Sequence, residues 1–263
     1  MAPADMNQRS EMGGTMRLRG KVAVVTGAGG GIGEACALRF AAEGAKICCN
    51  SVSGSAQRVV DRIRGNGGDA IFVQGDVSQE REAARVIDET VSRFGRLDIL
   101  YNNAGIVVGG TVENSSLEEF DRCLAVNLRG VFLCSRVAIP HLRSTGGTII
   151  NCSSAVALKG LPNRAAYSAS KGAVLSLTRA MAVDHLKDGI RINAVLPGTV
   201  DTPSLAVRLS QAENPAEARK QFIARQPLGR LGTAEEIAEA VLFLSLNSFC
   251  TGTGLCVDGG MTV

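Results

Sequence analysis

Tyr167 and Lys171 are the residues of this chain whose types and spacing most directly suggest chemistry. Residues four apart share one face of a helix, so the ammonium group can lie near the phenol. A phenol ionises only near pH 10 and is a poor base at neutral pH, but a nearby cation stabilises the phenolate. The pair therefore predicts an acid–base centre. The alternative is a tyrosine with an unrelated, solvated lysine.

A second feature with chemical meaning is the glycine-rich segment Thr26–Gly33, which reads TGAGGGIG. It follows the first apolar run and leads directly into a helical pattern. Glycines allow a tight turn and let the backbone approach a pyrophosphate held at a helix N-terminus. A flexible turn would look similar in isolation, but the position between strand and helix is the one that a dinucleotide site requires.

The elements that must position these residues alternate regularly along the chain. Seven short apolar runs have the length and β-branched content of buried strands. They are residues 21–26, 45–50, 70–74, 97–101, 148–152, 190–195 and 253–257. Helical spacing occurs between them at 32–43, 78–94, 117–144, 165–187 and 234–246. We therefore predict an α/β fold, with one doubly wound (Rossmann) domain over 17–263 and a seven-stranded parallel sheet covered by helices on both faces.

Two segments do not follow this alternation. Residues 1–16 are polar and contain glycine, and we expect a disordered extension in which Met16 is an alternative start. Residues 199–232 are polar, partly helical and punctuated by three prolines. Because a long segment beyond the carboxyl end of a strand can cover a site there, we predict a substrate lid.

Composition and charge exclude several classes of protein. The net charge is +3 without a basic run, which argues against nucleic acid as a partner. The eight cysteines form no CxxC pair and only two histidines occur, so we predict no metal site. The N-terminus lacks the apolar core of a signal peptide, and the uncharged stretch 240–257 is interrupted by polar residues. We therefore expect a cytoplasmic protein with reduced thiols and no membrane association.

The order of short motifs resembles the short-chain dehydrogenase/reductase family from about residue 17 to 263. The landmarks are Thr26–Gly33, Asp76-Val77, Asn102–Gly105, Asn127, Ser153-Ser154, Tyr167–Lys171 and Pro197-Gly198. The resemblance implies an NAD(P)-dependent oxidoreductase acting on CH–OH groups. It implies Ser154, Tyr167, Lys171 and Asn127 as catalytic residues, with Ser154 favoured over Ser153 because it lies thirteen residues before Tyr167. Asn127 would anchor a water of a proton relay, or be a buried amide bonded to backbone, or both.

The same resemblance implies a set of cofactor-binding residues. They are Gly27, Gly29, Gly30, Gly31, Ile32, Gly33, Ser51, Asp76, Val77, Asn103, Ala104, Gly105, Tyr167, Lys171, Pro197, Gly198, Val200 and Thr202. NAD-preferring members carry an Asp where this chain has Ser51, so a 2′-phosphate would not be repelled there. The basic residues of many NADP-preferring members are missing too, since Gly30 and Val52 occupy their positions. Because Asn50, Ser51 and Ser53 could donate to a phosphate and Arg58 could reach it, we favour NADP over NAD.

Substrate class is suggested by residues 197–205 and 214–219. They resemble the branch that holds cytosolic type 2 3-hydroxybutyrate dehydrogenase and bacterial 2-keto-3-deoxy-L-fuconate dehydrogenases, which act on small carboxylates. Arg164, Arg208 and Arg225 match arginines of the substrate pocket in that branch. Guanidinium groups bind carboxylates through paired, charge-assisted bonds, so we predict a small hydroxy acid as substrate.

Other interpretations stay open at this point. One is a reductase of carrier-bound 3-oxoacyl groups or other ketones, and another is a nucleotide-sensing or scaffold protein that has lost the chemistry. The helical segments at 117–144 and 165–187 carry apolar residues on more than one side, for example Val131, Phe132, Val174 and Leu175. The matching helices pair in relatives. We therefore expect a homo-oligomer, and specifically a homotetramer.

Overall fold

A computed structural model describes residues 16–263 of the chain. The sheet contains seven strands, all parallel, in the order β3-β2-β1-β4-β5-β6-β7. The strands are β1 (Val22–Val25), β2 (Lys46–Ser51), β3 (Ala70–Gln74), β4 (Ile99–Asn102), β5 (Thr148–Cys152), β6 (Arg191–Pro197) and β7 (Gly254–Val257). The predicted fold class is confirmed, and each predicted strand lies within two residues of an observed one.

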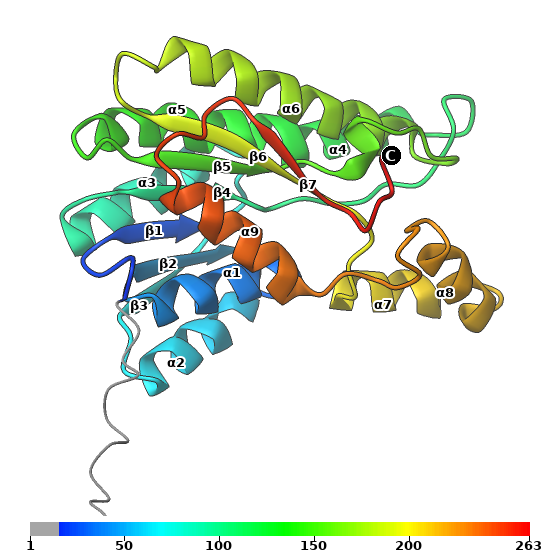
Figure 1. The fold of residues 1–263 in the computed structure, drawn as a ribbon, viewed down its shortest axis with the longest axis horizontal. Helices are drawn as coiled ribbons and strands as arrows, with labels where there is room; N and C mark the ends of the chain where they lie inside the picture. The colour runs from blue at the N-terminus through cyan, green and yellow to red at the C-terminus, as the bar shows by residue number, and fades with distance from the viewer. Residues whose placement is uncertain (1–15) are drawn as a thin grey trace, which may run out of the picture.

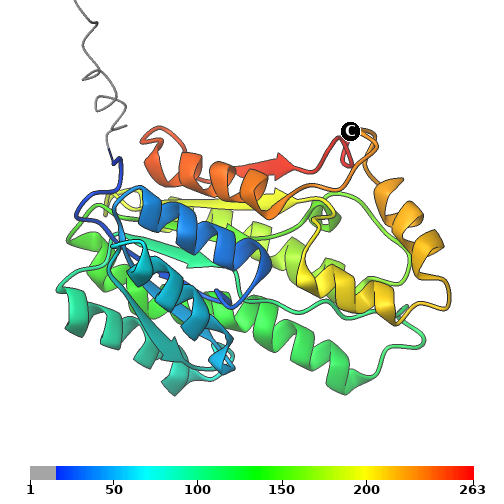
Figure 2. The same cartoon turned by 90° about the horizontal axis from the view of Figure 1, so that it is seen from below.

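Helices cover both faces of this sheet (Figure 1). They are α1 (Gly31–Ala42), α2 (Gln57–Gly65), α3 (Glu80–Phe94), α4 (Leu117–Leu124), α5 (Gly130–Arg143), α6 (Ala165–Asp184), α7 (Pro203–Ser210), α8 (Pro215–Ile223) and α9 (Ala234–Leu246). Figure 2 shows α1 and α9 side by side on one face. Helix α2 was not named from the sequence, because only Val59, Val60 and Ile63 mark its buried side.

Local sequence explains where these helices begin and end. In α3, Ala83, Val86 and Ile87 recur at helical spacing and are buried, and Gly95 ends the helix in the left-handed region at φ 78°. Helix α9 begins at a capping box, in which Thr233 accepts a bond from the backbone of Glu236 and the Glu236 carboxylate accepts one from the backbone of Thr233. These signals fix the helices against the sheet.

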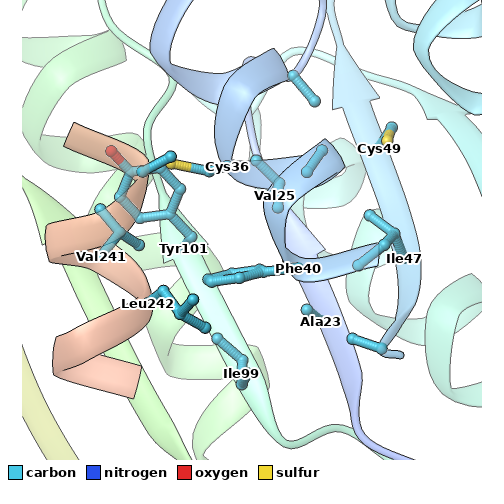
Figure 3. Close-up of a cluster of buried hydrophobic side chains, with 14 of the residues drawn as sticks. Ala23, Val25, Cys36, Phe40, Ile47, Cys49, Ile99, Tyr101, Val241 and Leu242 are labelled. Carbon is cyan, nitrogen blue, oxygen red and sulfur yellow. The ribbon is translucent and has the colours of Figure 1, made fainter. Parts of the chain in front are cut away.

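The core forms two main clusters, one on each face of the sheet. Phe40, Tyr101 and Leu242 belong to the cluster beneath α1 and α9 (Figure 3). The opposite cluster packs residues such as Val86, Leu133 and Ile190 against the strands. Strands buried on both faces need continuous apolar sequence, which is why these strands could be predicted from apolar runs.

The segment predicted as one helix over 117–144 is divided in the structure. A five-residue π-helical turn, Ala125–Arg129, separates α4 from α5. Leu117–Arg143 is long and apolar enough to cross a membrane by length and composition, yet it packs against α3, α6 and β4 as a core helix does. Of the four apolar residues offered as an outer surface, Val131, Val174 and Leu175 are buried within the chain, and only Phe132 is exposed.

The edge of the sheet where a ligand crevice is expected lies at the carboxyl ends of the strands. Strand order reverses between β1 and β4, and a doubly wound sheet forms its ligand crevice at such a point. Helices α7 and α8 lie beyond that edge (Figure 1). The extension predicted at 1–16 lies outside the described residues apart from Met16, which is half exposed.

Candidate active site

A cavity of about 380 Å³, open to solvent, lies at the carboxyl ends of β1, β4, β5 and β6. Helix α6 forms one wall, and α7 and α8 form another. Thirteen of the predicted cofactor residues line it: Gly27, Gly30, Gly31, Ile32, Asn103, Ala104, Gly105, Tyr167, Lys171, Pro197, Gly198, Val200 and Thr202. Ser154 and the three predicted arginines line it as well. The cavity thus brings segments from the whole length of the chain together.

The glycine-rich loop at one end leaves no room for side chains at Gly27, Gly29 or Gly33. A Cβ at Gly33 would overlap the carbonyl oxygen of Gly27, and a Cβ at Gly27 would lie 2.8 Å from Ala104 Cα. Gly27 also adopts φ 63°, which disfavours other residues. Gly30 caps α1 without a side-chain bond, so the first N–H groups of the helix remain available. This cradle fits the pyrophosphate of a dinucleotide.

Asn103 holds the glycine-rich loop to the end of β4. Its Nδ2 donates to the carbonyl oxygens of Thr26 at 3.0 Å and Gly27 at 3.1 Å. In return, Thr26 Oγ1 accepts from the backbone N–H groups of Asn103 and Ala104, each at 3.0 Å. The side chain of Asn103 therefore positions the loop, and only the remaining surface of the residue is left to face a ligand.

Tyr167 and Lys171 lie on the same side of α6, as their spacing predicts. Lys171 Nζ lies 5.8 Å from the centre of the Tyr167 ring and donates to the carbonyl oxygen of Cys152 at 2.7 Å. Lys171 is only 4% exposed, and that bond to β5 keeps the buried ammonium in place. The arrangement places a fixed cation beside a phenol that is accessible from the cavity.

The two serines at the end of β5 have different environments. Ser153 Oγ donates to the carbonyl oxygen of Lys171 at 2.8 Å, which ties β5 to α6. Ser154 Oγ accepts a long bond of 3.4 Å from the backbone of Val156, and its own proton has no acceptor among the bonds of the described residues. Ser154 is therefore the serine with a donor left for a ligand.

Asn127 lies in the π-helical turn and is completely buried. Its Oδ1 accepts from the backbone N–H of Ile106 at 2.8 Å, and its Nδ2 donates to the carbonyl oxygen of Ile106 at 2.9 Å. A Cβ at Gly105 would lie 3.2 Å from Asn127 Oδ1 and 3.4 Å from Lys171 Nζ, so both groups converge over Gly105. The backbone-bonded alternative is present, and Asn127 also faces the lysine.

The opposite end of the cavity is strongly basic. Arg164 precedes α6, Arg208 belongs to α7, and Arg225 follows α8. The guanidinium carbons of Arg208 and Arg225 lie 5.4 Å and 4.2 Å from the centre of the Phe222 ring. Burial lowers the pKa of both groups below the usual arginine value, and the neighbouring charge of Arg164 lowers the pKa further. The three arginines converge, as expected.

Six predicted residues lie outside the cavity surface: Gly29, Gly33, Ser51, Asp76, Val77 and Asn127. Ser51 Oγ donates to the carbonyl oxygen of Ser53 and accepts from Ala56 N at 3.2 Å, so its hydroxyl is used within the turn. Asn50 Nδ2 donates to the carbonyl oxygens of Val73 and Gly75. The expectation that these two side chains hold a phosphate is therefore wrong for Asn50, whose donors are both satisfied, and weakened for Ser51.

Arg58 is placed near the glycine-rich loop but is already paired. It forms two bonds to the Glu34 carboxylate and one to the carbonyl oxygen of Gly29 at 3.0 Å. These contacts place the guanidinium next to the loop, as we expected from the sequence. They also partly neutralise its charge.

Several residues that line the cavity were missed from the sequence, and Met261 and Phe222 are two of them. Met261 is 2% exposed, lines the cavity and packs on Tyr167, and Lys159 Nζ donates to its carbonyl oxygen at 2.7 Å. No spacing signal links the end of the chain to the cavity. Phe222 was also missed, although its position three residues before Arg225 could have suggested a shared helical face. No group of His, Cys, Asp or Glu that could hold a metal occurs within residues 16–263.

Comparison with known proteins is consistent across the chain. The family model described as enoyl-(acyl carrier protein) reductase matches residues 27–262. An uncharacterized oxidoreductase of Thermotoga maritima is 45% identical, over 94% of this chain and 99% of the relative. Meso-2,3-butanediol dehydrogenase of Serratia marcescens is 41% identical, over 94% of this chain and 96% of the relative.

One further relative and one solved structure bear on substrate and cofactor. Cis-4-hydroxycyclohexanecarboxylate dehydrogenase of Sinomonas cyclohexanicum is 41% identical, over 92% of this chain and 96% of the relative. The 3-ketoacyl-(acyl-carrier-protein) reductase of Brucella melitensis, solved in complex with NADH, is 39% identical with a TM-score of 0.85. That match covers 94% of this chain and 100% of the reductase.

Proposed function

The chain belongs to the short-chain dehydrogenase/reductase family of oxidoreductases, which act on CH–OH groups, and we propose that its substrate is a small hydroxy acid. The observation that carries this proposal is the basic end of the cavity. Arg164, Arg208 and Arg225 meet there, and none of them forms an ion pair with a carboxylate of the described residues. Half-buried cations without a counter-charge favour an anionic ligand.

The family uses a nicotinamide cofactor, and the glycine-rich cradle supports its binding here. The loop from Gly27 to Gly33 would hold the pyrophosphate on the N–H groups at the start of α1. When bound, the nicotinamide group accepts a hydride from the alcohol or donates one to the carbonyl compound. Gly105, Pro197 and Thr202 line the way from that loop toward Tyr167.

Tyr167 is the proposed acid–base residue. Its phenolate takes the hydroxyl proton as the alcohol is oxidised, and the phenol returns that proton to the carbonyl oxygen in the reverse direction. Lys171, held by the carbonyl of Cys152, stabilises the phenolate electrostatically. Ser154 donates its free proton to the substrate oxygen and stabilises the charge that develops there.

Asn127 is proposed to support the proton path through Lys171. It fixes the Ile106 backbone and leaves Oδ1 near the space over Gly105, opposite Lys171 Nζ. A water bound between these two groups would connect the ammonium with solvent. The role therefore combines both interpretations drawn from the sequence.

We further propose a preference for NADP, in which Ser51 leaves the end of β2 free of a repelling carboxylate. Arg58, beside Gly29, is the cation that would approach a 2′-phosphate, in exchange for part of its pairing with Glu34. Within this proposal, the substrate is of the kind used by the sugar-acid and hydroxybutyrate branch, which residues 197–205 resemble. The printed name of the Sinomonas relative, a carboxylate dehydrogenase, is in line with it, whereas that of the Serratia relative is a neutral diol dehydrogenase.

Assembly, location and the lid are part of the same proposal. An apolar hollow between α4–α5 and α6, lined by Leu128, Phe132 and Leu177, suits a helix-to-helix contact in a homotetramer. All eight cysteines, which lie within the described residues, are free, as a cytoplasmic protein requires. Segment 199–232, with α7 and α8, would act as the substrate lid over the cavity.

The second candidate is a reductase of carrier-bound 3-oxoacyl groups, favoured by the similarity to the Brucella reductase. That activity needs a basic outer surface beside the cavity for an acidic carrier protein. The arginines observed here line the inside instead. Both candidates use the same catalytic residues, so only the substrate separates them.

A panel of substrates, each measured with NAD and with NADP, tests the proposal directly. Small hydroxy acids should give kcat/KM values at least about tenfold above those of neutral alcohols of matched size, because only the acids contact the guanidinium groups. Equal rates with acids and neutral alcohols would contradict the hydroxy-acid proposal. Higher rates with acyl thioesters of a carrier protein would favour the second candidate.

A further inference from the structure

The basic end of the cavity holds more positive charge than one carboxylate can neutralise. Among the described residues that line the cavity, four are cationic and none is Asp or Glu: Arg164, Lys171, Arg208 and Arg225. Elsewhere in the chain, Arg96, Arg143 and Arg219 each pair with a carboxylate, at 2.7, 2.9 and 2.7 Å. Resting on the proposed function, we propose that the part of the substrate beneath α7 and α8 carries two negative charges.

Hydrogen-bond donors at this end are largely unused. Arg208 Nε donates to the carbonyl oxygen of Ser204 within its own helix, and Arg164 Nη1 donates to that of Asn163. Arg225 makes no side-chain hydrogen bond within residues 16–263. Each guanidinium has five N–H donors, whereas a carboxylate has two oxygen atoms. One carboxylate can pair with one or two of these groups, and it leaves the third without an acceptor.

Phe222 explains why like charges are held close together. Its ring lies beneath the guanidinium groups of Arg208 and Arg225 and packs into a small cluster with Leu205, Leu209 and Leu231. Attraction between a cation and an aromatic face orients each guanidinium and leaves its N–H edge free. An anion placed between the groups relieves the repulsion that remains between them. Two negative charges relieve it more completely than one.

The position of the cluster assigns these charges to the substrate rather than to the cofactor. The phosphates of a dinucleotide belong at the glycine-rich loop, at the other end of the cavity. Arg164 lies three residues before Tyr167, and its backbone forms an isolated β-bridge with Gly110. Two chemistries provide the charge, either one dianionic phosphate or phosphonate group or a pair of carboxylates.

Binding of matched non-reactive anions to the cofactor-loaded enzyme tests this inference by calorimetry. Propylphosphonate and propanesulfonate share a tetrahedral head and differ by one charge above the second ionisation of the phosphonate. At about pH 9 the phosphonate should bind about tenfold more tightly, and at about pH 5.5, where both are monoanions, the difference should disappear. Succinate against butyrate makes the same comparison for two carboxylates. The better pair of the two identifies the source of the charge.

Two variants separate this site from general surface charge. Arg225→Gln should remove most of the preference for the dianion. Arg219→Gln is the matched control, because Arg219 lies on α8 but is already paired with Asp201. Monoanions that bind as well as dianions would overturn the inference while leaving the hydroxy-acid proposal intact. If neither binds better than a neutral analogue, the hydroxy-acid proposal itself is wrong.

Discussion

The glycine-rich end of the cavity presents backbone N–H groups to a ligand, whereas the end beneath α7 and α8 presents long cationic side chains. At the first end, a Cβ at Gly33 would overlap Gly27, and Asn103 and Thr26 lock the loop through four bonds. At the second end, the side chain of Arg225 makes no hydrogen bond within residues 16–263, and that of Arg208 donates one only to Ser204 of its own helix.

The difference teaches which end can change during evolution. In the backbone cradle, a Cβ at Gly27, Gly29 or Gly33 would come within 3 Å of neighbouring atoms, so a side chain at these positions would disturb the loop. The arginines of the other end lie before α6, on α7 and after α8, outside the strands, so single substitutions there should leave the sheet undisturbed. We therefore propose that the chain combines a fixed cofactor end with an adaptable substrate end, and Tyr167 lines the same cavity.

The largest expected effect comes from Tyr167→Phe, at the boundary between the two ends. Loss of the phenolic hydroxyl should lower kcat by about 10³- to 10⁴-fold, because the proposed acid–base group is removed and a serine hydroxyl is a far weaker acid. Cofactor affinity, measured by fluorescence titration, should stay nearly unchanged. Retention of more than a few per cent of activity would show that Tyr167 is not the acid–base residue.

Gly33→Ala tests the fixed end. The added Cβ cannot fit against the Gly27 carbonyl, so cofactor binding should weaken by at least about a hundredfold, while circular dichroism checks that the fold persists. Gly65→Ala is the control, since a Cβ at Gly65 meets no atom within 4 Å. Normal cofactor affinity in Gly33→Ala would refute the description of the loop as a rigid cradle.

Arg164→Ala tests the adaptable end. Loss of one charge-assisted interaction should reduce kcat/KM for a hydroxy acid by about ten- to a hundredfold, or about 1.5–3 kcal/mol, with less change for a neutral alcohol. Arg208→Ala and Arg225→Ala should have smaller effects, because both belong to the segment proposed to close as a lid. An equal loss for acid and neutral substrates would show that these arginines do not distinguish charged from neutral substrates.

Ser51→Asp tests the proposed cofactor end at the last residue of β2. A carboxylate at the end of β2 would repel a 2′-phosphate, so the ratio of kcat/KM for NADP over NAD should fall by about tenfold or more. The matched change Ser53→Asp, farther along the turn, should have less effect. A wild-type preference for NAD of more than tenfold would show that neutral groups suffice for the ribose.

Asp98→Asn should leave activity unchanged, because Asp98 lies at the amino end of β4, away from the cavity. Burial raises the pKa of Asp98, but bonds from Arg96, Lys21 and the Val22 backbone outweigh it and lower the pKa below the usual Asp value. The resulting stability exists above about pH 4 and is lost as the pH falls through the lower, folded-state pKa. Urea unfolding should show a loss of about 2 kcal/mol at pH 7 that shrinks in acid. A loss independent of pH would contradict this.

Much of the fold could be predicted because its sequence signals are local. Apolar strands such as Thr148–Cys152 and the glycines of Thr26–Gly33 need no knowledge of distant residues. Lys171 and Tyr167 could be paired because they are four positions apart on a helix. Where a signal was short, as in α2, or broken, as at the π-helical turn, the pattern missed or merged the element.

The remaining parts of the site depend on tertiary contacts. Met261 reaches the cavity because Lys159 and the last turn of the chain direct it there, and no periodicity encodes that path. Ser51 could not be judged from its position alone, because its hydroxyl is satisfied by the turn that follows it. The sequence shows which side chains could act in the site, but it does not predict their hydrogen-bond partners.

The π-helical turn Ala125–Arg129 has a consequence for insertions and deletions. Each residue of an α-helix advances the helix by about 100°. Deleting one residue from the turn would therefore rotate α4 relative to α5 by about that angle. Asn127 could then face Ile106, or Leu133 and Ala138 could face the core, but not both. The chain length between α4 and α5 is thus constrained by packing, although neither helix contributes a residue to the lining of the cavity.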